Sequence, residues 1–173
     1  MNSKKNKIGI LGGSFDPAHK GHLAISREAI KRLKLKKIIW AITKKNPFKK
    51  KSDTNLITRI KYCKKIIGKN NSIKVKFYED IIKSNKTISL INYVTKNKIN
   101  KFFFLMGADN LVSFHKWHKW KTISQKCDIV VFDRHGYKKK SLNSVTFKRL
   151  NKKKLNFIEF DKVNISSSQL RKI

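Results

Sequence analysis

The chain alternates short apolar runs with longer segments in which apolar residues recur every three or four positions. Short apolar runs are typical of buried strands, and the longer spacing is typical of helices with one buried face. The pattern predicts six strands, at residues 8–11, 38–42, 73–77, 102–106, 129–132 and 155–160, and helices at 21–33, 54–67, 87–97 and 108–125. Strands that alternate with helices predict a Rossmann-like α/β fold, with a mostly parallel sheet covered by helices on both faces.

Two polar segments interrupt this alternation. Residues 44–53 contain Pro47 and a lysine run, and residues 134–141 contain Gly136 and three lysines, so both are predicted as loops. No repeat or low-complexity linker marks a boundary, and residues 1–173 are interpreted as one domain. No apolar run approaches the roughly 20 residues of a membrane span or resembles a signal peptide, so we expect a cytoplasmic protein without membrane contact.

The formal net charge of +33 would attract nucleic acid without sequence specificity. The basic residues are spread along the chain, together with abundant asparagine and isoleucine, and these residues share A- and T-rich codons with lysine. Genome base composition is therefore a sufficient cause, and we expect no specific nucleic-acid partner. A basic nucleic-acid-binding domain without turnover is the alternative from a different functional class.

The residues after the first strand can hold phosphate. Two glycines let a ligand approach the backbone, and the amino end of the next helix offers free N–H groups. His19 and His22 are three apart, so both imidazoles can project from the first helical turn and donate to phosphate. An ordinary turn, a solvated helix start or half of a metal site would account for the same residues.

Two later segments can likewise be interpreted either as structural or as part of a binding site. Asp109 follows the strand at 102–106 and can either cap the next helix or accept hydrogen bonds from a ribose. Trp117 and Trp120 are three apart, a spacing more typical of core residues. Near the end of the chain, residues 166–168 are three serines that predict a helix start, with Arg171 as an added cation; a simple capping box is the alternative.

The cysteines and the second histidine pair do not predict a metal site. Cys63 and Cys127 are isolated, and His115 and His118 lack a third ligand nearby, whereas protein-held metal sites need three or four. We expect reduced, structural cysteines and no metal held by side chains.

The run GGSFDPAHKGH, from Gly12 to His22, resembles the first signature of the nucleotidyltransferase superfamily, whose members carry H-x-G-H or T-x-G-H after the first strand. Within that superfamily it is similar to the bacterial nicotinate-nucleotide adenylyltransferases. His19 favours this branch over the phosphopantetheine adenylyltransferases, which normally have threonine there. The pattern G-A-D-N-L followed by W-x-x-W is similar to the same family, and ISSSQLR resembles the superfamily's I-S-S-T-x-[IL]-R signature.

The resemblance implies transfer of the adenylyl group of ATP to nicotinate mononucleotide, with Mg²⁺ carried mainly by the ATP phosphates. Another acceptor, nicotinamide mononucleotide or phosphopantetheine, is the alternative within the class, and the oligomeric state stays open. The family's usual P-x-x-P-H-K histidine is missing near Phe48, and Lys44, Lys45 or Lys49 can supply charge instead. The implied site comprises catalytic His19, His22 and Arg171; ATP-binding Gly12, Gly13, Ser14, Phe15, Asp109, Ser166, Ser167 and Ser168; and acceptor-binding Thr87, Trp117 and Lys45.

Overall fold

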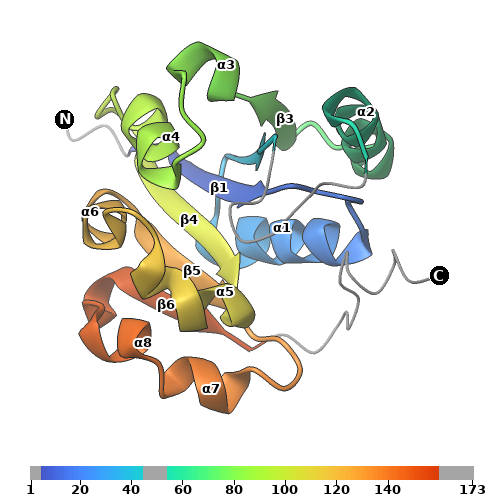
Figure 1. The fold of residues 1–173 in the computed structure, drawn as a ribbon. Coiled ribbons are helices and arrows are strands. Elements are labelled where there is room, and N and C mark those ends of the chain that lie inside the picture. The colour runs from blue at the N-terminus through green and yellow to red at the C-terminus, as the bar shows by residue number, and fades with distance from the viewer. Residues whose placement is uncertain (1–4, 45–53, 160–173) are drawn as a thin grey trace.

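The computed structural model describes residues 5–44 and 54–159 (Figure 1). The strands are β1 (Lys7–Gly13), β2 (Lys37–Ile42), β3 (Ile73–Phe77), β4 (Lys101–Gly107), β5 (Asp128–Phe132) and β6 (Leu155–Ile158). The longer helices are α1 (Lys20–Leu33), α2 (Leu56–Ile67), α4 (Thr87–Val94) and α6 (Trp120–Lys126). The shorter ones are α3 (Glu79–Ile82), α5 (Ala108–Ser113), α7 (Lys138–Leu142) and α8 (Val145–Arg149), with 3₁₀ turns η1 (Phe114–Lys116) and η2 (Lys152–Lys154).

The six strands form one parallel sheet in the order β3-β2-β1-β4-β5-β6. The chain first winds outward from β1 to β3 and then returns to pair β4 with β1. Strand order therefore reverses between β1 and β4, and ligands of such sheets bind in the crevice beyond the carboxyl ends at this switch point. The predicted fold class is confirmed, and the carboxyl end of β1 is placed where a nucleotide site is expected.

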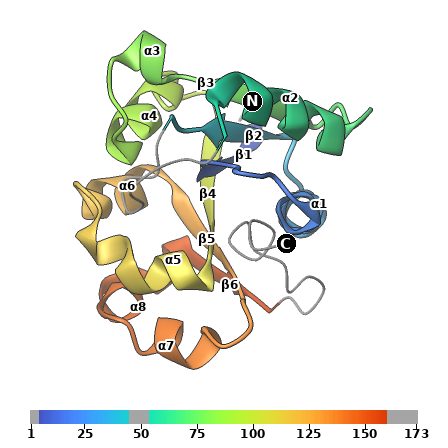
Figure 2. The same cartoon turned by 45° about the vertical axis from the view of Figure 1, so that its right-hand side comes forward.

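Alternate residues of the central strands enter two separate cores. In β4, Phe102, Phe104 and Met106 join the core under α4, α5 and α6, while Phe103 and Leu105 join the core under α1 and α2. The two layers of helices lie on opposite sides of the sheet (Figure 2). Because both faces of β4 are buried, its sequence is a continuous apolar run, as expected for a central parallel strand.

The strand predictions agree with the structure, and the main differences concern helices. The stretch at 108–125 is not one helix, because Trp117 adopts an extended backbone and Lys119 a left-handed one with φ 52°. It forms α5, η1 and α6 in succession. The predicted loop at 134–141 also ends in a helix, since α7 begins at Lys138 and packs, like α8, against α5 (Figure 1).

Among residues 5–44 and 54–159, no helix combines the length and the apolar character that crossing a bilayer would require. The prediction of loop structure at 44–53 falls almost entirely outside the described residues.

Candidate functional site

A cavity of about 360 Å³ opens at the carboxyl ends of β1 and β2. Its floor contains Phe104 from β4, and its walls come from the loop after β1, from α3, from the start of α4 and from the segment after α5. The lining residues predicted from sequence are Gly12, Gly13, Ser14, Thr87 and Trp117. The structure therefore brings predicted ATP-binding and acceptor-binding residues to one cavity.

The loop after β1 is held in an unusual conformation. Phe15 has φ 48°, in the left-handed region that aromatic residues rarely adopt. Its side chain is buried, stacks on Trp40 with ring centroids 4.9 Å apart, and contacts the His22 ring at 4.8 Å. Only the backbone of Phe15 is thus placed to serve the predicted ATP site, while its ring belongs to the core.

His19 and His22 lie together at the amino end of α1, with ring centroids 3.8 Å apart. His19 is the N-cap residue: its Nδ1 accepts a hydrogen bond from the Gly21 N–H at 3.1 Å. The His22 Nδ1 in turn accepts from the His19 N–H at 3.1 Å, which completes a capping box made of two imidazoles. Because a neutral imidazole has one N–H, both rings carry it on Nε2, which remains a donor.

Both imidazoles are neutral at physiological pH. Burial, together with the positive charge of Arg134, lowers the pKa of His19 to about 4. Burial first, and then the neighbouring charges of His19 and Arg134, lowers the pKa of His22 to about 3. The pair is therefore a set of fixed, uncharged Nε2–H donors, and not the near-neutral titrating pair that the sequence alone allows.

Asp109 lies in the first turn of α5 and forms an ion pair with Arg134, which follows β5. Its Oδ1 is buried and accepts no hydrogen bond from the described residues. A Cβ on Gly107 would come within 2.4 Å of that oxygen, so any other residue at this position would require the Asp109 carboxylate to move. The arrangement presents one acceptor oxygen and one guanidinium at the ends of β4 and β5.

Trp117 lies in the wall of the cavity that the segment after α5 contributes. Its ring is half-buried and meets Phe114 edge-to-face at 5.2 Å and Phe104 at 6.1 Å. Two cations, Lys86 and Lys116, also line this cavity, and each directly precedes another lining residue, Thr87 at the start of α4 and Trp117 after η1. This wall offers an aromatic face with positive charge beside it, a combination suited to a planar anion.

Several predicted site residues lie outside the described part of the chain: Lys45, Ser166, Ser167, Ser168 and Arg171.

Sequence reasoning missed two arginines near the site. Arg134 begins a segment that the sequence predicts only as a loop, but its charge acts on both histidines and it pairs with Asp109. Arg134 is the second residue after the buried strand β5. Because ligands of parallel sheets bind at the carboxyl ends of strands, the reasoning that identified Asp109 after β4 would also have identified Arg134. Arg59 resembles an ordinary helix cation in sequence, and only its burial, with 3% of its surface exposed, shows otherwise.

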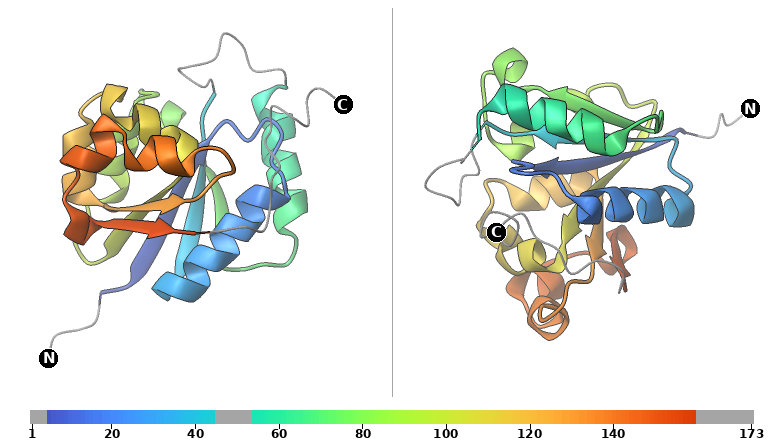
Figure 3. Two further views of the ribbon diagram at one scale, coloured as in Figure 1. Left: turned by 90° about the horizontal axis from the view of Figure 1, so that it is seen from below. Right: turned by 90° about the vertical axis from the view of Figure 1, so that its right-hand side faces the viewer.

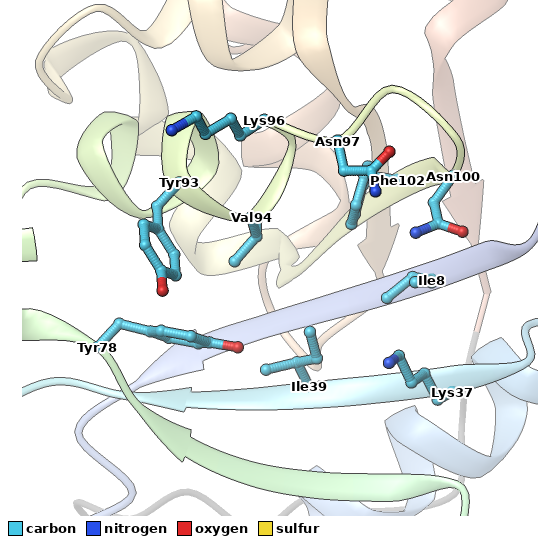
Figure 4. A pocket seen from close by; sticks show the side chains of 10 residues that line it. All are labelled: Ile8, Lys37, Ile39, Tyr78, Tyr93, Val94, Lys96, Asn97, Asn100 and Phe102. Carbon is cyan, nitrogen blue, oxygen red and sulfur yellow. The ribbon is translucent and has the colours of Figure 1, made fainter. Parts of the chain in front are cut away.

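A second cavity, of about 560 Å³, lies toward the amino ends of the strands (Figure 4). It is lined by Ile8, Lys37, Ile39, Tyr78, Tyr93, Val94, Lys96, Asn97, Asn100 and Phe102. No site residue predicted from sequence lines it, and ligands of parallel sheets bind at the carboxyl ends. The smaller cavity is therefore the candidate active site.

Residues 5–44 and 54–159 offer neither a reactive thiol nor a cluster of metal ligands. Cys63 and Cys127 are free and buried, and burial raises the pKa of each thiol to about 12, which disfavours a thiolate nucleophile. In that part of the chain no three histidine, cysteine or carboxylate side chains gather into a possible metal site.

Residues 10–173 match the family model described as cytidylyltransferase-like. A protein of Pelagibacter ubique described as "Probable nicotinate-nucleotide adenylyltransferase" is 68% identical over 173 residues, 100% of this chain and 96% of its own length. A protein of Agrobacterium fabrum with the same description is 35% identical over 75% of this chain and 70% of its own length. Among solved structures, the nicotinic acid mononucleotide adenylyltransferase of Plasmodium falciparum complexed with NaAD has a similar fold. Its TM-score is 0.79 at 22% identity, over 96% of this chain and 83% of that one.

Proposed function

The chain belongs to the nicotinate-nucleotide adenylyltransferase family of cytidylyltransferase-like proteins, and on that basis we propose that it transfers the adenylyl group of ATP to nicotinate mononucleotide. The products are nicotinate adenine dinucleotide and pyrophosphate, and the reaction serves NAD biosynthesis. Relatives with this description supply the acceptor assignment, and the geometry of the site supplies the chemistry.

The observation that carries the chemistry is the pair of neutral imidazoles at the amino end of α1. A phosphate oxygen of the acceptor attacks the α-phosphorus of ATP, and the bond to the departing pyrophosphate breaks in line. Negative charge shifts onto the oxygens around the α-phosphorus and onto pyrophosphate. Fixed N–H donors stabilise that charge without having to reorient, and this is the main catalytic device available here.

The acceptor's pyridine ring is assigned to the wall that contains Thr87 and Trp117. Lys86 and Lys116 line the same cavity and favour a carboxylate over a neutral amide by their charge. Asp109 is assigned to a ribose diol, for which its unpaired Oδ1 is a suitable acceptor. By resemblance, Ser166 to Ser168 and Arg171 hold the pyrophosphate, and Lys45 adds charge near the acceptor.

Mg²⁺ fits this site as a companion of ATP. Asp109 is engaged with Arg134, and the described residues offer no carboxylate cluster. The ion would be held mainly by phosphate oxygens and water, as Mg²⁺ in nucleotide sites commonly is, and would neutralise charge on the phosphates.

The proposal is tested by supplying purified protein with ATP, Mg²⁺ and one acceptor at a time, and following pyrophosphate release. Nicotinate mononucleotide should give the highest kcat/KM, ahead of nicotinamide mononucleotide and phosphopantetheine. The His22→Ala variant, purified identically, controls for a contaminating enzyme. A preference for either other acceptor would overturn the acceptor assignment. Absence of turnover with all three, together with tight salt-dependent RNA binding, would favour the nucleic-acid alternative.

A further inference from the structure

Arg59, on α2, is buried and donates four hydrogen bonds, all to backbone carbonyls. Its Nη1 donates to Ser14 O at 2.6 Å and to Thr43 O at 2.8 Å. Its Nη2 donates to Lys44 O at 2.8 Å, and its Nε to Thr54 O at 3.0 Å. The guanidinium thus joins the loop after β1, the end of β2 and the segment before α2.

In the loop after β1, the orientation of each carbonyl group determines where the following N–H group points. In a trans peptide unit the C=O and the next N–H point in opposite directions. The Ser14 carbonyl is fixed by Arg59, and the Gly13 carbonyl accepts from the Thr43 N–H at 3.0 Å. The N–H groups of Ser14 and Phe15 are therefore turned away from β2 and α2.

Those two N–H groups donate to no other residue among the described ones. Gly13 and Ser14 line the candidate active site, and the ring of the next residue, Phe15, contacts the ring of His22 with centroids 4.8 Å apart. Backbone N–H groups gathered in a tight turn are suited to bind an anion.

The loop needs such a holder because its conformation is strained. A left-handed backbone at a residue other than glycine is energetically unfavourable and persists only where the surroundings enforce it. Stacking on Trp40 fixes the Phe15 ring from one side, and Arg59 fixes the preceding carbonyl from the other. α1 and α2, which carry the imidazoles and Arg59, cover the same face of the sheet (Figure 3).

We propose that Arg59 is a positioning residue for phosphate binding: it holds the Ser14 carbonyl so that the Phe15 N–H faces the phosphates of ATP. Arg59 does not touch the substrate in this role. The inference rests on the proposed function for the identity of the ligand, and ATP binding alone tests it without requiring transfer.

The first test compares Arg59→Lys with the wild-type chain. A lysine keeps the charge and the stem but cannot reach four carbonyls with one planar fork. We expect the Kd for ATP, measured by calorimetry without acceptor, to rise about tenfold, which corresponds to about 1.4 kcal/mol. We also expect kcat to fall about tenfold, with Arg59→Met more severe than Arg59→Lys in both measurements.

Ile67→Ala is the matched control, because Ile67 is a buried residue at the carboxyl end of the same helix and forms no hydrogen bond with the carbonyl groups that Arg59 holds. Measured well below its melting temperature, it should bind ATP and turn over as the wild type does, although it melts earlier. If Arg59→Lys behaved like Ile67→Ala, Arg59 would be a structural residue only, and the proposal would be wrong.

A second measurement uses the wild-type chain and does not depend on how the variants fold. The Phe15 amide resonance in a ¹⁵N-labelled sample should shift on addition of ATP and Mg²⁺. An unmoved Phe15 resonance at saturating ATP would overturn the proposal. If ATP binds as expected but no acceptor is adenylylated, the proposed function fails while the role of Arg59 in binding stands.

Discussion

The chain contains two histidine pairs with the same spacing, and the structure treats them differently. His19 and His22 share the first turn of α1, with touching rings and lowered pKa values. His115 belongs to η1, and His118 is an exposed residue beyond it. The extended backbone at Trp117 separates these two, so they share no helix face.

The difference shows that spacing alone does not make a functional pair. The first pair follows a glycine-containing strand end and supplies its own helix cap, which fixes the orientation of both rings. In the second pair, the His115 N–H donates to Thr146 Oγ1 at 3.0 Å and so ties η1 to α8, while His118 lines the cavity. The first pair provides two fixed N–H donors at the amino end of α1. In the second pair, His115 takes part in packing and His118 in the cavity wall.

The largest effect should come from removing one member of the first pair. His22→Ala should lower kcat by about 10² or more, the scale of losing a donor to transition-state charge. His115→Ala should leave kcat within about twofold, because His115 does not line the candidate active site. Steady-state kinetics of both variants, with circular dichroism to verify folding, makes the comparison. Equal kcat values for the two variants would abolish the distinction between the pairs.

Trp117 separates the second pair and should affect binding of the acceptor more than catalysis. Trp117→Leu keeps an apolar side chain but removes the flat ring, so we expect KM for nicotinate mononucleotide to rise about tenfold, in line with roughly 1–3 kcal/mol per stacked ring. KM for ATP should change little. An equal rise in both KM values would indicate a general disturbance of the cavity instead.

Titration should distinguish the first pair from an unperturbed imidazole, whose pKa is near 6.5. NMR of the free protein should find His19 and His22 neutral at pH 6, with protonation only near pH 4 and below. In Arg134→Met the pKa values of both should rise, because a nearby positive charge is removed. If either ring were half protonated near pH 6.5, it would not be the fixed neutral donor described above.

The smallest effect should appear in the pH dependence of stability. Between about pH 6.5 and 4 the unfolded chain binds protons at His19 and His22 that the folded chain does not. Stability should therefore fall as pH decreases through this window. The difference in Tm between pH 7.5 and 5.0 should be smaller in the double variant His19→Ala/His22→Ala than in the wild type. An unchanged difference would contradict the lowered pKa values.

The strands and the two long helices on the α1–α2 face could be predicted because burial dictates their residue pattern. The secondary structure of the stretch at 108–125 was harder to predict, for a physical reason. Its core residues, Leu111, Phe114, Trp117, Trp120 and Ile123, recur every three positions. That spacing keeps apolar side chains on the core while the backbone passes through α5, a 3₁₀ turn, a break and α6.

The sequence by itself determined the order of the strands along the chain, the prediction of a phosphate site at Gly12 to His22 and the family resemblance, because these depend on local spacing and residue type. The tertiary structure decided the charge state of the two imidazoles, since burial and Arg134 come from packing. It also decided the pairing of Asp109 with Arg134 and the contact of Arg59 with the loop after β1. These contacts join residues about 25 and 45 positions apart, a separation that no local pattern records.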